Sequence, residues 1–364
     1  MSKLDRIQVR GYKSIREMDL ELRPLNILIG ANGAGKSNFV SLFRLLNAVV
    51  SRRLQLFVGK AGGADALLHF GTKTTPEIAC RFRSEDVDRS FILLPAIDGS
   101  VVICGKEQDA EVPLLDGSFP VSPGHARDEA GLHPEALFAS ETLGQWMPEE
   151  IVDWGVYHFH DTSDSAGVKQ LCDIRDNRIL RSDGSNLASI LYLLKETHPD
   201  HYRNIVETVR MAAPFFDDFD LRPTELNENR IRLDWLEKGQ DTYFGPEMLS
   251  DGTLRFVCLA TLLLQPKLPS VIIIDEPELG LHPYAINLLA SMLKSVSTRA
   301  EVIVCTQSVT LVNQFVPEDV IVVDREDGQS VFRRLSSEDT EAWLEDYALG
   351  DLWEKNIIGG RPSL

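Results

Sequence analysis

Hydrophobic and polar residues alternate with two different periods along this chain, and together they predict a mixed α/β fold. In Arg6–Tyr12 and Met18–Leu22 every second residue is apolar, a pattern typical of half-buried strands that pair as an antiparallel ribbon. The run Leu25–Ile29 predicts a further strand, and apolar residues from Phe39 to Val50 recur at helical spacing. We therefore expect a ribbon followed by a strand–loop–helix unit.

Short β-like segments follow this first helix. They are separated by Gly, Pro and Asp turns and comprise Glu77–Arg83, Phe91–Ala96 and Val101–Cys104, which predicts an antiparallel β-lobe. Residues 105–134 are rich in Gly, Pro, Asp and Glu without periodicity, so we expect a long mobile surface loop there. Glu135–Val152 then predicts one helix, broken at Pro148.

The middle of the chain predicts a helical lobe between two short strands. Helical spacing of apolar residues occurs in Asn186–Glu196 and Tyr202–Met211, while Val156–Phe159 and Ile231–Leu236 have strand character. No heptad repeat and no internal repeat runs through this region, which excludes a long coiled-coil arm.

The last third of the chain returns to alternating strands and helices. The segment Leu249–Thr253 opens an apolar helix that continues through Leu264, and Ala285–Val296 predicts a second helix. Continuous β-branched runs, typical of strands buried on both faces of a parallel sheet, occur at Val271–Ile274, Val302–Cys305 and Val320–Val323. After Ser336 we expect a short helix and a tail to which the sequence assigns no chemistry.

These elements predict four consecutive parts. Residues 1–104 and 246–335 would form the two halves of one globular head, 105–245 an inserted loop and helical lobe, and 336–364 a C-terminal tail. A length of 364 residues, 43% hydrophobic and 25% charged, is typical of a soluble globular protein with ordinary cores.

The net charge of −18 argues against a broad basic surface, because non-specific nucleic-acid binding requires many Lys and Arg contacts to phosphate. We therefore expect any contact with nucleic acid to be local or indirect. The chain opens without an apolar signal segment, and its longest apolar runs, Phe256–Leu264 and Val271–Ile274, are too short to span a bilayer. These features predict a cytoplasmic protein without a membrane partner.

Five scattered cysteines form no C-x-x-C pair. This spacing disfavours a zinc ribbon and a disulfide framework, and predicts reduced, largely buried thiols. The five are Cys80, Cys104, Cys172, Cys258 and Cys305.

Gly30–Ser37 reads G-A-N-G-A-G-K-S and matches the phosphate-binding loop G-x-x-x-x-G-K-[ST]. Its glycines allow successive backbone N–H groups to point at phosphates, the Lys36 ammonium would contact the β- and γ-phosphates, and the Ser37 hydroxyl would be a Mg²⁺ ligand. The strand before the loop and the helix after it supply the context that this motif requires. We expect ATP contacts from the whole loop and the next residue, namely Gly30, Ala31, Asn32, Gly33, Ala34, Gly35, Lys36, Ser37 and Asn38.

A second chemical element is the acidic pair that ends the strand Val271–Ile274. Asp275 would complete the Mg²⁺ site with Ser37, and Glu276, one residue further, would polarise the attacking water. A third element is Leu249–Thr253, in which Ser250, Asp251 and Gly252 form an anion nest at a helix N-terminus. One chain is poorly placed to use both this nest and the phosphate loop on the same nucleotide, because the loop already wraps the phosphates.

The order of these motifs, completed by Glu278–Pro283, resembles the ATP-binding-cassette superfamily and, within it, the RecF/SMC/OLD-type ATPases. The opening Gly11–Ile15, the stretch Tyr157–Ser163 and Thr306-Gln307-Ser308 are similar to the same group. The resemblance implies a P-loop NTPase of ABC-ATPase head type, with a mixed central sheet, an antiparallel β-lobe and an inserted helical lobe. It also implies ATP and Mg²⁺ as cofactors and a head-to-tail homodimer, in which Ser250 and Gly252 serve the partner's γ-phosphate.

The chain departs from the transporter pattern of this superfamily at three positions. Asp251 and Thr253 replace the usual Gly and Gln, and Gln307 stands where transporter subunits have a switch His. Gln307 can hold a water or the γ-phosphate by hydrogen bonds, but it cannot supply a proton. The family's Q-loop would fall at His158–Asp161, which contains no Gln; His160 and Asp161 are either metal- or phosphate-sensing residues or satisfied strand-end residues.

A further acidic run, Asp324–Asp327, invites comparison with the metal site of the Toprim nuclease domain that follows the ATPase in OLD-type nucleases. Too little chain remains for such a domain, so we interpret the run as an acidic loop and expect no nuclease activity in this polypeptide. Family analogy instead allows a separately encoded nuclease or toxin as partner.

Three functions remain open on the sequence. The first is an ATP hydrolase whose nucleotide-dependent dimerisation controls a separate effector in anti-phage defence, or a DNA-processing step. The second is a RecF-like repair ATPase that binds DNA directly, which the acidic charge balance disfavours. The third is the ATP-binding subunit of a membrane transporter, which the Gly11–Ile15 opening and Glu278–Pro283 disfavour.

Overall fold

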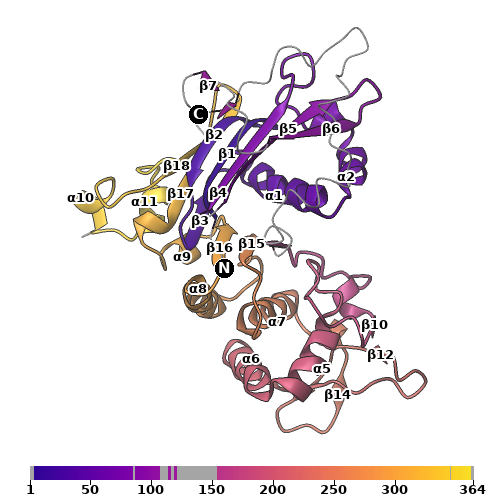
Figure 1. The fold of residues 1–364 in the computed structure, drawn as a ribbon. Coiled ribbons are helices and arrows are strands. Elements are labelled where there is room, and N and C mark those ends of the chain that lie inside the picture. Colours follow the sequence, from indigo (N-terminus) through magenta and orange to yellow (C-terminus); the bar gives the residue numbers. More distant parts are fainter. Residues whose placement is uncertain are drawn as a thin grey trace.

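The computed structural model describes residues 4–84, 87–106, 114–115, 119–120, 154–344 and 346–361. Figure 1 shows an upper part, in which an antiparallel sheet and helix α1 lie together, and a lower part built mainly of helices. The central six-stranded sheet lies between them.

The central sheet has the strand order β18-β17-β3-β16-β15-β9, and β3, β16, β15, β17 and β9 run parallel while β18 is antiparallel to β17. Its strands are β3 (Leu25–Ile29), β9 (Trp154–Tyr157), β15 (Val271–Asp275), β16 (Glu301–Cys305), β17 (Val320–Glu326) and β18 (Gln329–Arg334). Every residue of β3 and β16 is buried, as the continuous apolar runs predicted. The mixed sheet of the predicted fold class is therefore confirmed.

The five-stranded sheet has the order β2-β1-β4-β5-β6, with every neighbouring pair antiparallel. It comprises β1 (Leu4–Tyr12), β2 (Ile15–Glu21), β4 (Ile78–Ser84), β5 (Val87–Pro95) and β6 (Val101–Lys106). The predicted ribbon and β-lobe are thus one sheet. Sequence reasoning did not assign α2 (Leu54–Ala61), a helix of only 8 residues that ends at Gly62 in the left-handed conformation.

The helical part contains α5 (Leu187–Thr197), α6 (Pro199–Ala212) and α7 (Asp251–Leu264), close to the predicted ranges. The single strand predicted at Ile231–Leu236 is wrong. It is two strands, because β12 (Arg230–Ile231) pairs with β10 (Cys172–Asp173), whereas β13 (Asp234–Glu237) pairs with β11 (Phe216–Asp220) and β14 (Tyr243–Phe244). The chain bends between them, where the Asp234 amide donates to the Arg232 carbonyl at 3.0 Å and the two side chains form an ion pair.

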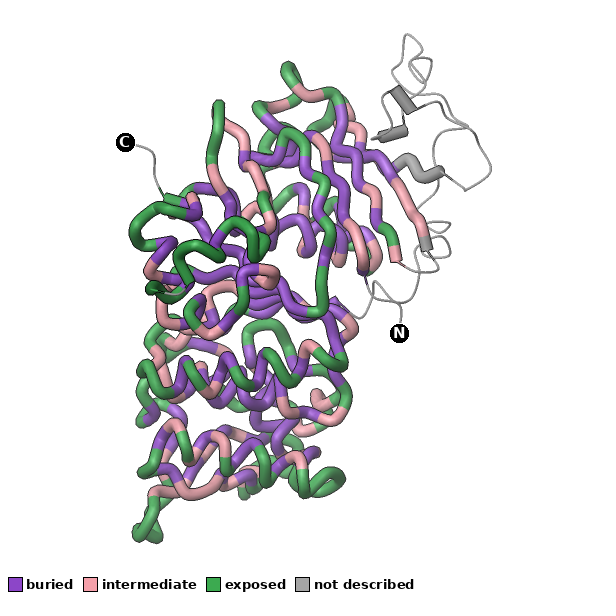
Figure 2. Tube along the Cα trace, turned by 90° about the vertical axis from the view of Figure 1, so that its left-hand side faces the viewer, coloured by how far each residue is buried: buried purple, intermediate pink, exposed green. Residues whose placement is uncertain are grey.

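Alternate residues of the central strands face two separate hydrophobic cores. In β16, Val302 and Val304 pack with the apolar residues of α7 and α8 (Pro283–Ser297), whereas Ile303 and Cys305 pack with α1 (Lys36–Val50) and the antiparallel sheet. Figure 2 shows the buried strands inside the molecule and exposed positions along its outer turns. The central sheet is therefore covered on both faces, which holds the carboxyl ends of its strands in one rigid edge.

The C-terminal part adds α9 (Val309–Val312), α10 (Glu341–Leu344) and α11 (Leu349–Glu354), so the tail has two short helices where one was predicted. All of the predicted helix Glu135–Val152 and most of the predicted loop 105–134 lie outside the described residues. Within that loop the structure describes the paired dipeptides β7 (Leu114–Leu115) and β8 (Phe119–Pro120). No helix in the described part of the chain combines the length and apolarity needed to cross a membrane.

Candidate nucleotide-binding site

The loop Gly30–Ser37 connects the carboxyl end of β3 to α1, and its backbone depends on glycine. Gly33 and Gly35 have φ of 81° and 122°, which side chains rarely adopt. A Cβ atom on Gly30 would lie 2.3 Å from the Val323 carbonyl oxygen, and one on Gly35 would lie 2.0 Å from Ser330 Oγ. The glycines therefore serve both conformation and close approach to neighbouring strands.

Lys36 lies folded against the loop that it follows. Its Nζ donates to the carbonyl oxygens of Gly30 at 2.5 Å and Ala31 at 3.2 Å, and the residue is 6% exposed. Burial lowers the pKa of Lys36, and the nearby carboxylates of Glu276 and Asp275 partly oppose that shift. No side chain caps the N-terminus of α1, so its free amide groups and the ammonium together fit a phosphate group.

Three polar side chains outside the motif support the loop from behind. Asn38 Nδ2 donates to Ser14 Oγ at 2.7 Å, while Ser330 Oγ lies 2.7 Å from Ser14 Oγ and 2.5 Å from the Ala34 carbonyl. Ser14 comes from the β1–β2 turn, within the Gly11–Ile15 opening, and Ser330 comes from β18. Sequence reasoning missed Ser330, since a polar residue on an amphipathic strand gives no local signal of this contact.

Asp275 ends β15 at the same edge of the sheet. Burial and the neighbouring Glu276 raise the pKa of Asp275, and a divalent cation would favour its ionised form. Ser37 lies exposed in the first turn of α1. Among the described residues no group of three or more His, Cys, Asp or Glu is arranged to hold a metal, but Mg²⁺ commonly takes one or two protein oxygens together with substrate phosphates. The predicted pair fits that chemistry.

A second carboxylate, that of Glu276, accepts a hydrogen bond from Gln307, the residue that stands where transporter subunits have a switch His. Gln307 Nε2 donates to Glu276 Oε1, and the Glu276 amide donates to the Cys305 carbonyl at 2.8 Å. Glu276 has φ of 45°, an uncommon conformation for a residue other than glycine. The ends of β15 and β16 thus bring the side chains of Glu276 and Gln307 into contact.

Glu278 supports this region and was not among the predicted site residues. Its Oε1 accepts from Thr306 Oγ1 at 2.6 Å and from the Gln307 amide at 3.0 Å, whereas its buried Oε2 has no hydrogen-bond partner. Burial raises the pKa of Glu278. The only sequence signal was its position two residues after Glu276 in the family motif.

The predicted signature residues lie at the start of α7. Ser250 caps the helix by accepting from the Thr253 amide at 3.2 Å, and its Oγ lies 2.8 Å from Thr253 Oγ1, so the unusual Thr253 strengthens the cap. A Cβ atom on Gly252 would lie 2.1 Å from the Gly280 carbonyl oxygen. Asp251 is exposed in the first turn. No hydrogen bond or ion pair in the described structure connects Ser250–Gly252 to the phosphate loop.

Arg255, one turn further along α7, ties three segments together. Its guanidinium donates to the carbonyl oxygens of Phe159 at 3.0 Å, His160 at 2.9 Å and Leu279 at 2.9 Å. The signature helix, the segment after β9 and the segment after β15 are therefore connected through one side chain.

The polar residues after β9 have partners within the chain. His160 Nε2 lies 2.9 Å from the Asp275 carbonyl, and Asp161 Oδ1 accepts from the amide and hydroxyl of Ser163. These contacts favour the interpretation as satisfied strand-end residues. Burial, and then the charge of Arg44, lowers the pKa of His158, which favours its neutral form.

The interpretation of Asp324–Asp327 as an acidic loop is wrong for its first three residues, which end β17 and pair with β18; only Asp327 lies in the turn between the two strands. Asp324 Oδ1 accepts from the Gly360 amide at 2.8 Å, and Arg325 Nη1 donates to the Gly33 carbonyl at 3.1 Å. The end of β17 therefore contacts the phosphate loop through a cation, which the sequence did not predict. Elsewhere, the four described cysteine thiols, Cys80, Cys172, Cys258 and Cys305, are free and buried.

The fold and site are those of a P-loop ATPase of ABC head type. The phosphate loop follows β3, the acidic pair ends β15 and the glutamine follows β16, and an antiparallel sheet and a helical part lie on either side. The chain belongs to the family described as "AAA domain, putative AbiEii toxin, Type IV TA system", whose model matches residues 121–313. A second family model, "AAA ATPase domain", matches residues 2–147.

Solved structures agree with this assignment at the level of fold. A structure of the Smc head bound to the C-winged helix domain of ScpA has a TM-score of 0.62 at 14% identity and covers 93% of this chain and 99% of its own. Smc head domains derived from Pyrococcus furiosus and Pyrococcus yayanosii, also 14% identical, have TM-scores of 0.58 and 0.54, each covering 95% of this chain and 99% of its own. No functionally curated protein matches the sequence at a significant level. The predicted resemblance to the RecF/SMC-like ATPases is confirmed.

Proposed function

We propose that this protein binds ATP with Mg²⁺ and hydrolyses it between two copies of the chain, and that the resulting dimerisation controls a separately encoded effector. In this proposal Gly30–Asn38 hold the triphosphate, and Ser37 and Asp275 hold Mg²⁺, which neutralises charge that develops on the phosphates. Glu276 polarises the attacking water, and Gln307 orients Glu276. The family of ATPase domains to which the chain belongs supports this activity.

One observation carries the proposal of a shared site. Ser250 and Gly252 sit at the N-terminus of α7, yet no hydrogen bond or ion pair among the described residues joins them to their own chain's phosphate loop. An anion nest of this kind is complete only when phosphate reaches it. A second copy of the chain, bound head to tail, would bring its nucleotide there.

Mixing two inactive variants tests this arrangement. Lys36→Ala removes the loop ammonium, and Ser250→Arg blocks the anion nest. In a mixed dimer one site would combine the intact loop of the Ser250→Arg chain with the intact nest of the Lys36→Ala chain. If the chains exchange freely and the sites act independently, ATPase activity should return to about a quarter of the wild-type rate.

Each variant alone should be inactive while remaining folded by circular dichroism. Activity that stays at background in the mixture, although labelled chains demonstrably exchange, would contradict the shared site. A mixture of Lys36→Ala with Glu276→Gln serves as control. Both changes affect the half of the site that contains the phosphate loop, so no site in the mixed dimer is intact and activity should stay at background.

The proposal of a separate effector is supported by the family description and by one similar solved structure. The family's description names a toxin system, and the Smc head of the solved structure carries a partner domain, that of ScpA. We propose a nuclease or toxin partner in anti-phage defence. Affinity purification from the native cells in ATP should recover such a protein with Glu276→Gln and not with Lys36→Ala; recovery that is equal with both variants would contradict nucleotide control.

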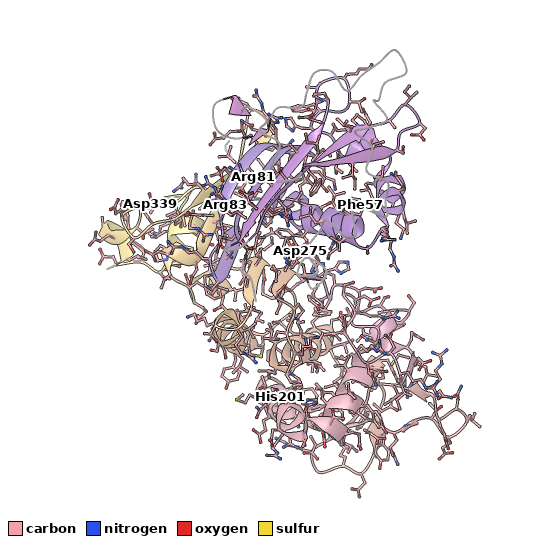
Figure 3. All side chains as sticks on the ribbon, viewed as in Figure 1. Phe57, Arg81, Arg83, His201, Asp275 and Asp339 are labelled. Carbon is pink, nitrogen blue, oxygen red and sulfur yellow. The ribbon has the colours of Figure 1, made fainter. Side chains whose placement is uncertain are left out.

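Direct DNA binding is less well supported by the surface of the antiparallel sheet. Several of its arginines are paired with carboxylates: Arg81 and Arg83, labelled in Figure 3, contact Asp88 at 2.7 and 3.3 Å, and Arg6 contacts Asp19 at 2.5 Å. Paired guanidinium groups release fewer counterions from DNA. Steep salt-dependent DNA binding by the isolated protein in ATP would favour the RecF-like alternative instead.

A further inference from the structure

A cavity of about 440 Å³ opens beside the candidate ATP site and contains none of its predicted residues. Its walls come from α1 and α2, from the edge strand β9, and from residues 179–182 of the helical part. In Figure 3, Phe57, one of its lining residues, is labelled on α2, and Asp275 is labelled at the end of β15, the strand next to β9. The cavity therefore lies where the upper and lower parts of the molecule meet, a common position for ligand sites.

The walls of this interlobe cavity are fixed by hydrogen bonds between its three sources. Asn47 Nδ2, on α1, donates to the Trp154 carbonyl at 2.9 Å, and the Trp154 ring lies 5.6 Å from the ring of Phe43. The His158 amide, after β9, donates to the Ser182 carbonyl at 3.1 Å. The space is thus formed by elements that hold one another in place.

The cavity is basic although the chain is acidic. Arg44, Arg53 and Lys60 line it, and none of the described residues that line it is Asp or Glu, whereas the whole chain has 55 acidic and 37 basic residues. None of these three side chains forms a hydrogen bond or an ion pair with a described residue. Arg44 is in addition half-buried, and although its charge acts on Asp275, no carboxylate of the described residues forms an ion pair with it, which favours an anionic ligand beside it.

Apolar side chains stand beside these cations. Leu56 and Ile179 are 58% and 69% exposed, and both line the cavity together with the half-buried Phe57. Large apolar side chains with this exposure, next to unpaired cations, favour a ligand with a flat apolar part and an anionic part. A volume near 440 Å³ is within the roughly 300–1,000 Å³ of small-molecule sites.

We propose that this cavity binds a small phosphorylated molecule of nucleotide size, with phosphate toward Arg44, Arg53 and Lys60 and its base over Leu56, Phe57 and Ile179. The site is separate from the phosphate loop, since no residue of Gly30–Ser37 lines it. It would place a second ligand between the two parts of the head, against the strand that precedes His158.

The test uses the four common nucleoside monophosphates as probes, titrated calorimetrically into the full chain carrying Lys36→Ala, which removes the ammonium of the phosphate loop. At least one probe should bind saturably. Arg53→Gln, added to this background, should weaken binding by about 10-fold or more, as expected for a lost charge-assisted contact. Arg52→Gln is the matched control, because Arg52 is the neighbouring exposed arginine and does not line the cavity; it should change affinity less than about 2-fold.

Ribose 5-phosphate, which has the phosphate without the base, should bind more weakly than the best nucleotide, and Leu56→Ser should reduce that difference. Absence of saturable binding by all four probes would overturn the proposal. Equal losses in Arg53→Gln and Arg52→Gln would also overturn it, because they would indicate general electrostatic attraction rather than this cavity.

Discussion

The side-chain amide of Gln307 donates a hydrogen bond to the carboxylate of Glu276, across the ends of the neighbouring strands β16 and β15. An amide at this position cannot exchange a proton as histidine does, but it can fix which way the carboxylate points. The arrangement places the predicted base on one strand and its orienting group on the next. It therefore allows the two roles to be separated by mutation.

Replacing Glu276 by Gln should remove the base and leave ATP binding intact. The variant keeps the size and a hydrogen-bonding group at this position but cannot accept the proton of the attacking water. We expect hydrolysis to slow by roughly 10²–10⁴-fold with an unchanged ATP dissociation constant. Single-turnover hydrolysis and equilibrium binding of ATP measure the two quantities separately, and wild-type turnover in this variant would remove Glu276 from the mechanism.

Replacing Gln307 by Ala should have a smaller effect, because the base remains and loses only its orientation. A hydrogen bond to a charged group contributes about 1.5–3 kcal/mol, so hydrolysis should slow by roughly 10- to 100-fold. Adding Gln307→Ala to Glu276→Gln should then cost little more, since the two residues act as one unit. Fully additive losses in this double-mutant cycle would show that Gln307 acts on something other than Glu276.

The phosphate loop offers a matched pair of glycines for a stability test. Both Gly33 and Gly35 have positive φ, but a Cβ on Gly33 would meet nothing within 4 Å, whereas one on Gly35 would collide with Ser330. Gly33→Ala should lower the free energy of unfolding by the backbone strain alone, about 1–3 kcal/mol. Gly35→Ala should cost roughly 1–3 kcal/mol more through overpacking. Urea unfolding without nucleotide measures both, and equal losses would exclude a role for Ser330.

The residues of this site differ in whether the sequence could predict them. Lys36, Asp275 and Ser250 were found because each belongs to a short motif, and because a buried parallel strand gives a continuous apolar run. Ser330 was not found, since its contacts to Ser14 and Ala34 join residues 316 and 296 positions apart. Such contacts depend on how β18 packs against the loop, and packing leaves no local pattern.

The same distinction explains two of the errors of local structure. The helix α2 is short and ends at a glycine, so its apolar spacing spans too few turns to be recognised. The segment Ile231–Leu236 has uniform strand character, but its two halves pair with different strands. Pairing partners are chosen by tertiary structure and not by propensity.

Arg255 should contribute to stability through its three carbonyl contacts. Arg255→Met retains much of the aliphatic side chain but removes the guanidinium donors from Phe159, His160 and Leu279. We expect the free energy of unfolding to fall by about 1–3 kcal/mol. Arg299→Met, at an exposed position at the end of α8, is the control and should change it by less than about 0.5 kcal/mol. Similar values for both variants would mean that the three contacts add nothing beyond an ordinary surface arginine.

Glu278 gives a prediction with a defined pH dependence. Burial raises the pKa of Glu278 above the usual value of a glutamate, so the ionised carboxylate is less favourable in the folded chain than in the unfolded chain. As the pH falls through the folded-state pKa toward 4.5, folding takes up a proton at this group and the wild-type protein gains stability from it. Glu278→Gln cannot gain this contribution, because its side chain does not titrate.

The difference in unfolding free energy between wild type and Glu278→Gln should therefore move in favour of wild type as the pH is lowered from 7 toward 5. Denaturant unfolding of both proteins at several pH values measures this difference directly. The other titrating groups are common to both proteins and cancel. A difference that is independent of pH, or that moves in favour of the variant at low pH, would contradict this prediction. It would mean that ionised Glu278, beside Thr306 and Gln307, does not lower the free energy of unfolding.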